Sequence, residues 1–177
     1  MKNFLILTIL LLAGSLSASS QTNEFYTGYS FTREDVKIVR PVFAFDNNTD
    51  SHGALASYTR YVKDNFIGIT GEVAGTYKTK NLNSLSVMGG LTLKSRGNKY
   101  VEPFLKGLIG VTRKEVGVTP FASSFNTREV AFSYLLGGGL DFKTKSKVKV
   151  RFGVDLLNTE FYNDRHNAVR LHTGLVF

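Results

Sequence analysis

The stretch VAFSYLLGGGLDF, residues 130–142, decides how this chain folds. One set of its alternate positions carries no charge and is mostly apolar: Val130, Phe132, Tyr134, Leu136, Gly138, Leu140 and Phe142. The intervening set consists of Ala, Ser, Leu and Gly and ends at the charged Asp141. A period of two residues is typical of a β-strand whose two faces meet different surroundings.

The same alternation recurs along the chain and predicts eight strands. Their ranges are Phe25–Phe31, Leu55–Tyr61, Phe66–Tyr77, Leu85–Leu93, Val101–Val111, Val130–Phe142, Val148–Leu156 and Val169–Phe177. The second strand has the weakest pattern, because Ser57 and Thr59 dilute the face that we take as apolar, the one with Leu55 and Tyr61.

Short and long links between these strands alternate strictly. The links at 63–65, 95–98 and 144–146 are tight turns, and those at 33–53, 78–84, 113–128 and 158–167 are longer. This order predicts an up-and-down barrel with all short turns at one end. The first long link contains the apolar run Val36–Phe45, but Pro41 has no N–H to donate to a strand ladder. We therefore interpret residues 34–52 as an extension or hairpin outside the eight strands.

The placement of charge indicates which face of the barrel points outward. The charged residues of the strands share their parity with Gly, Ser, Thr and Ala, and the opposite faces are almost free of charge. Lipid demands such a face, since a charge at the bilayer midplane costs about 2–4 kcal/mol. The sequence thus predicts an all-β fold, an eight-stranded antiparallel transmembrane barrel. The alternative is a secreted or periplasmic lipocalin-like carrier of a small hydrophobic ligand, with its apolar side chains inside.

Charged side chains should then face the lumen in near balance. The predicted network consists of Glu72, Glu102, Lys106, Asp141, Arg151, Asp155 and Arg170, with Lys149 on the same face. One interpretation is structural, because buried charges must be paired and small barrels fill their lumen with side chains. The other is a narrow gated pore in which the ion pairs exchange partners.

Residues 1–20 are expected to be a cleaved signal peptide. A basic start at Lys2 precedes the apolar run Phe4–Ala13, and small residues follow to Ser20. The apolar run is too short to cross about 30 Å of hydrocarbon as a helix. The barrel domain should then span residues 21–177, with cleavage after Ala18 or Ser20.

Composition argues against most catalytic and cofactor classes. The chain has no Cys, and its three histidines, His52, His166 and His172, are widely spaced. We therefore predict no catalytic residue, no metal and no cofactor. A lipid A-modifying barrel enzyme is a less favoured alternative, since it would need a His with a nearby Ser, and no His-x-Ser occurs. Nucleic acid is not an expected partner of an exported chain, although the net charge is +8.

Four short segments resemble the small eight-stranded outer-membrane barrels, the OmpA-like or OmpX-like group. They are residues 26–31 (YTGYSF), 64–68 (DNFIG), 102–104 (EPF) and 136–141 (LGGGLD), within a resemblance that covers 24–177 apart from 34–52. The resemblance implies the outer membrane of a Gram-negative bacterium, periplasmic turns and extracellular loops. It implies a monomer that is structural, adhesin-like or a narrow pore, not an enzyme. Expected partners are outer-membrane lipid and lipopolysaccharide, and the outer-membrane assembly machinery through the last strand, which ends at Phe177.

Overall fold

The protein is a closed β-barrel. The computed structural model describes residues 23–40, 43–62, 66–77, 82–96, 98–118, 125–161 and 164–177, so the expected signal peptide lies outside the described residues. In these ranges eight strands follow one another: β1 (Asn23–Arg40), β2 (Phe43–Val62), β3 (Ile67–Tyr77), β4 (Leu82–Lys94), β5 (Val101–Val118), β6 (Phe125–Lys143), β7 (Lys149–Phe161) and β8 (Asp164–Val176). In the described residues, no helix is long and apolar enough to cross a bilayer.

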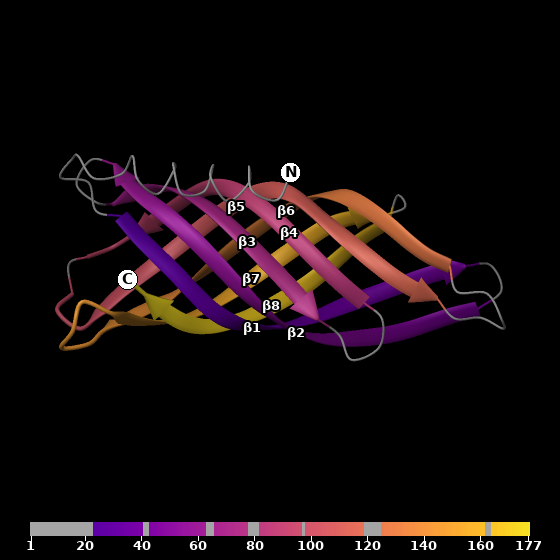
Figure 1. Cartoon of the computed structure of the whole chain (residues 1–177), viewed down its shortest axis with the longest axis horizontal. Helices are drawn as coiled ribbons and strands as arrows, with labels where there is room; N and C mark the ends of the chain where they lie inside the picture. The colour runs from indigo at the N-terminus through magenta and orange to yellow at the C-terminus, as the bar shows by residue number, and fades with distance from the viewer. Residues whose placement is uncertain are drawn as a thin grey trace, which may run out of the picture.

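Each strand pairs antiparallel with its chain neighbours, and β1 pairs with β8 to close the barrel (Figure 1). The closing ladder runs from Tyr26↔Val176 to Asp35↔Asn167. Closure leaves no free edge along this ladder, so in the closed part of the barrel each strand has a partner on both sides. The predicted eight-stranded antiparallel up-and-down barrel is confirmed.

The barrel has two different ends. We call the end with the links 63–66, 95–100 and 144–148 the turn end, and the opposite one the hairpin end. At the hairpin end the strands reach further than their apolar alternation predicts. β1 continues to Arg40 and β2 starts at Phe43, in register with each other, so residues 34–40 and 43–52 form a strand hairpin that belongs to β1 and β2. The expected hairpin is there, but its placement outside the eight strands is wrong. Likewise β5 continues to Val118, and β6 starts at Phe125. Hydrophobic alternation marks only strand segments with one apolar environment, so it ends before these strands do.

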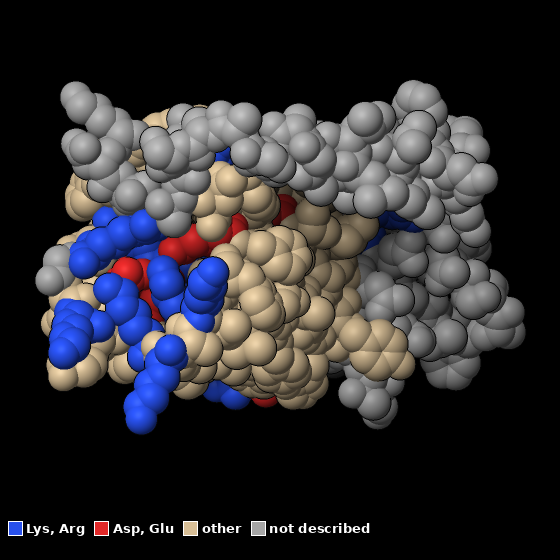
Figure 2. Space-filling model, turned by 60° about the vertical axis from the view of Figure 1, so that its left-hand side comes forward, with Lys and Arg blue, Asp and Glu red and all other residues tan. Residues whose placement is uncertain are grey.

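An apolar belt surrounds the barrel, and its polar side chains lie inside. Outward residues such as Leu136 and Leu105 are 64% and 63% exposed, whereas Asp141 and Asp155 are fully buried. Figure 2 shows this uncharged surface next to the charged turn end. On β5 the belt runs from Val101 to Val111, the length that a transmembrane strand needs. A lipocalin-like interior would be apolar, and this one carries charge.

The predicted apolar face of the second strand is wrong. Leu55, Ser57, Thr59 and Tyr61 are buried in the interior, and Tyr61 is only 1% exposed. Both faces of this segment mix apolar and polar residues, so periodicity could not distinguish them. The interior has room for the Tyr61 ring because the neighbouring position is Gly68, where a Cβ would lie 3.0 Å from the ring.

A charge in the middle of the belt should destabilise the barrel in a bilayer. Leu136 lies midway along the outer face of β6, and Val130, equally exposed, lies at its hairpin-end edge. We expect Leu136→Lys to lower the free energy of unfolding in phospholipid vesicles by about 2–4 kcal/mol and Val130→Lys by about 0–1 kcal/mol. Urea titrations of the two variants measure the difference, and equal effects would contradict a membrane-embedded belt.

Candidate functional site

The centre of the lumen holds a balanced group of charges, the central cluster: Glu72, Lys106, Asp155 and Arg170, with His172 beside them. Lys106 Nζ lies 2.7 Å from Glu72 Oε2 and 3.2 Å from Asp155 Oδ2. Arg170 donates to Asp155 Oδ2 from Nε at 2.9 Å and from Nη2 at 2.6 Å, and it also contacts Glu72. Two carboxylates thus meet two cations, and all four side chains are almost fully buried.

His172 connects the central cluster to Tyr26. Its Nδ1 lies 2.9 Å from the Tyr26 hydroxyl, and its Nε2 lies 3.5 Å from Asp155 Oδ2. Glycines make room for these groups: a Cβ at Gly137 would lie 1.9 Å from Asp155 Oδ1, and one at Gly153 would lie 2.3 Å from His172 Nε2. The glycines on the lumen face of β6 and β7 therefore leave the space that the large polar side chains of the neighbouring strands fill.

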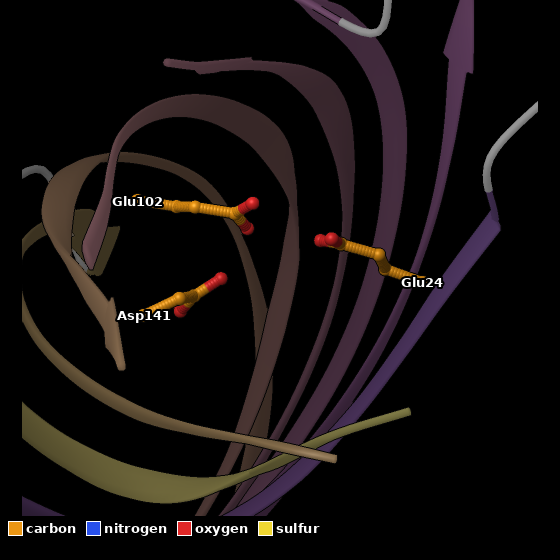
Figure 3. A group of neighbouring side chains, drawn as sticks. All are labelled: Glu24, Glu102 and Asp141. Atoms are coloured by element: carbon orange, nitrogen blue, oxygen red, sulfur yellow. The ribbon is translucent and has the colours of Figure 1, made fainter. Parts of the chain in front are cut away.

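A second group, the turn-end cluster, closes the lumen at the turn end. Its acids are Glu24, Glu102 and Asp141, whose carboxylates come from β1, β5 and β6 and point toward one another (Figure 3). Their oxygens lie within 4.8 Å of each other, a spacing that a metal ion could bridge. The ammonium of Lys94 already lies among them, at 2.6 Å from Glu24, 3.3 Å from Glu102 and 2.5 Å from Asp141. The three carboxylates therefore form an ammonium site, and a metal ion would have to displace Lys94.

Four further cations surround these acids. Arg151 forms a two-pronged pair with Asp141, with N···O distances of 2.7 and 2.8 Å. Lys149 bridges Glu24 and Glu102 at 2.8 and 2.7 Å. Lys143 contacts Glu102 at 3.0 Å, and Arg96 contacts Glu24 at 3.4 Å. With Lys94 the cluster contains five cations and three carboxylates, so this end has an excess of positive charge (Figure 2).

Toward the hairpin end the lumen filling becomes apolar and then uncharged polar. Met88, Leu108 and Leu135 pack together with Leu157 against them. Beyond them, four hydroxyl groups on adjacent strands form a hydrogen-bonded series: Ser86, Thr112, Ser133 and Thr159. Lys114 of β5 then reaches Glu34 of β1 at 2.8 Å. Side chains thus meet across the lumen at several levels.

The structure places all seven predicted lumen residues inside the barrel but divides them between two clusters. Glu72, Lys106, Asp155 and Arg170 are central, and Glu102, Asp141 and Arg151 lie at the turn end. Sequence reasoning missed Glu24 and Lys94, which lie one position beyond the predicted apolar strands. Extending the parity of those strands by one residue would have found both.

Removal of Lys94 should cost much more stability than removal of an exposed lysine at the same end. Lys94→Met removes the one ammonium that contacts all three buried carboxylates; the other four cations of the cluster remain, and loss of hydrogen-bond partners by buried charged groups costs about 1–3 kcal/mol. The matched control is Lys99→Met, whose side chain is exposed, with an expected change within about 0.5 kcal/mol. Urea unfolding of both variants in vesicles is the measurement, and similar stabilities would refute the ammonium site.

The comparisons with known proteins bear on the fold. No family model matches the chain, and no curated protein has a similar sequence. Among solved structures, Neisserial surface protein A superposes with a TM-score of 0.68 at 10% identity, covering 89% of this chain and 98% of that one. Ail, the attachment invasion locus protein of Yersinia pestis, gives 0.59 at 19% identity, covering 88% and 97%.

The N-terminal β-barrel domain of Pseudomonas aeruginosa OprF gives a TM-score of 0.54 at 11% identity, covering 89% of this chain and all of that domain. At such identities the similarity concerns the backbone arrangement. It extends over nearly the full length of each partner, which agrees with the closed eight-stranded order. The chain therefore has the fold of the small eight-stranded outer-membrane β-barrels.

Proposed function

We propose that this protein is a small integral outer-membrane barrel of a Gram-negative bacterium, exported by a cleaved signal peptide. It does not catalyse a reaction; it serves as a sealed membrane anchor that presents hairpins at the cell surface. The observation that carries the proposal is the inverted arrangement of the wall, with an uncharged belt outside and paired charges inside. In water this arrangement would expose its apolar side chains and bury its charges, which is the reverse of a soluble barrel.

The filled lumen supports a sealed anchor over an open pore. The central cluster joins Glu72 of β3 to Arg170 of β8, and the Lys114–Glu34 pair joins β5 to β1. Between them lie the packed side chains of Met88 and its neighbours. Passage of an ion would require several of these contacts to open together.

The hairpin end supports a role in presentation. The β1–β2 ladder continues past the last pair that joins β1 to β8, Asp35↔Asn167, as far as Arg40↔Phe43. The β5–β6 ladder likewise reaches Val118↔Phe125 (Figure 1). The barrel thus holds two strand hairpins beyond the belt. Ail, the attachment invasion locus protein, has the same barrel fold, which favours an adhesin-like role here.

Membrane integration is tested by fractionation. The full chain should sediment with the outer membrane, resist extraction with urea, and migrate differently on a gel before and after boiling. A soluble periplasmic protein without a heat-dependent shift would overturn the proposal and favour a lipocalin-like carrier.

Conductance distinguishes the sealed anchor from the narrow pore. Purified barrels in a planar bilayer should show no resolved current steps, because the ion pairs and the apolar layer fill the lumen. Arg170→Ala, which removes the cation shared by Glu72 and Asp155, provides the comparison. Steps in the unmodified protein would contradict the sealed lumen and favour the narrow pore.

Orientation is tested with an epitope. A tag inserted between Arg40 and Phe43, at the tip of the β1–β2 hairpin, should bind antibody on intact cells. The same tag inserted after Ser146, in the β6–β7 turn, should bind only after the outer membrane is permeabilised. The opposite pattern would show that the hairpins face the periplasm and would refute presentation at the cell surface.

A further inference from the structure

An apolar groove crosses the outside of the barrel over β6, β7, β8 and β1. Its volume is about 510 Å³, within the range of ligand-sized pockets. Strand register aligns a row of outward side chains across these four strands: Leu140, Phe152, Thr173 and Tyr29. The short Thr173 thus lies between two aromatic residues, Phe152 and Tyr29, which are each about half exposed.

A glycine deepens the groove on one side. Gly138 faces outward, so the floor of the groove there is bare backbone. Gly139 and Gly153, whose Cβ positions point into the lumen, pair across β6 and β7 and contribute only backbone to the lining. The next row, Gly138, Val154, Leu171 and Phe31, continues the groove toward the hairpin end.

The two strands that form the glycine side also carry the most basic turn. The sequence KTKSKVK, residues 143–149, links β6 to β7. Lys143 and Lys149 contact acids of the turn-end cluster, whereas Lys145 and Lys147 are exposed. Lys149 and Phe152 are three residues apart on β7, about 10 Å at 3.3 Å per residue. One leaflet contributes roughly 15 Å of the hydrocarbon core, so the groove begins in the leaflet that is next to this turn.

From this juxtaposition we propose that the groove and the β6–β7 turn form a binding site for one anionic phospholipid. An acyl chain lies over Thr173 between Phe152 and Tyr29, and the phosphate contacts Lys145 and Lys147. The proposal rests on the membrane location proposed above. That location also determines the occupant, because hydrocarbon chains are the molecules in contact with the outer face of a belt.

Charge selects the headgroup. The turn-end cluster has more cations than carboxylates, and Lys143 and Lys149 already contact its acids. The positive charges of Lys145 and Lys147 are therefore not balanced by this cluster. A basic segment at the membrane surface attracts anionic lipid, by about 1 kcal/mol per lysine. A second copy of the protein is a poorer occupant. The groove has room for a single acyl chain, whereas stable protein interfaces bury about 1,200 Å² or more.

Native mass spectrometry of the full barrel tests the site. The protein is inserted into vesicles of phosphatidylcholine and phosphatidylglycerol in equal amounts with identical acyl chains, and is then released in mild detergent. We expect about one phosphatidylglycerol to remain bound, in preference to phosphatidylcholine. Thr173→Phe, which fills the groove, should lower retention of both lipids at least about fivefold. The matched control is Val87→Phe on β4, on the opposite side of the barrel, which should retain lipid as the unmodified protein does.

The headgroup contact is tested separately. Lys145→Gln with Lys147→Gln removes two positive charges and should reduce the preference for phosphatidylglycerol at least about fivefold. Lys99→Glu changes the net charge by the same amount in another turn and should leave the preference intact. Equal retention of the two lipids by the unmodified protein, or unchanged retention in Thr173→Phe, would overturn the proposal. A heat-dependent gel shift of the same samples reports insertion, so failure of the membrane location is distinguished from failure of the lipid site.

Discussion

Within its apolar belt the wall of this barrel can place charge only on its inner side, and the paired interior follows from that constraint. A strand has two faces, and an apolar outer face leaves every charged residue of the belt to the lumen. An eight-stranded lumen is only wide enough for side chains. Charges confined to that space need partners within hydrogen-bonding distance, and Glu72, Lys106, Asp155 and Arg170 provide them for one another.

The same constraint made the fold predictable. In residues 130–142 the outer face excludes charge and the inner face ends at Asp141, so the sequence reports both faces at once. Where neither face was purely apolar, as in Leu55–Tyr61, the prediction assigned the inner face to the outside. Where strands leave the belt, as β1 does beyond Phe31, the apolar alternation ends although the ladder continues to Arg40. The alternation therefore predicted only those strand segments whose outer face is apolar.

The membership of the candidate site was largely readable, and its pairing was not. Parity alone placed Glu102, Asp141 and Arg151 on the inner face. The pairs form between strands far apart in sequence, such as Glu24 of β1 with Lys94 of β4, and depend on strand tilt and stagger, which fix the height of each residue in the lumen. A one-dimensional pattern contains no information about those heights. The ammonium site of Lys94 and the division into two clusters therefore needed the three-dimensional structure.

The composition of the turn-end cluster also bears on how the barrel assembles. Glu24 comes from the first strand, Lys94 and Glu102 from the middle of the chain, and Lys149 from the seventh strand. Among the described side chains, the cations that contact Glu24 lie on β4, on β7 and in the link after β4, and none of them lies on β2, the strand that follows β1 in the chain. The first strand thus keeps an unneutralised acid until the sheet curls far enough for distant strands to face one another. Closure of the cylinder and neutralisation of Glu24 are for this reason coupled, whereas pairs between adjacent strands, such as Asp141 with Arg151, need no closure.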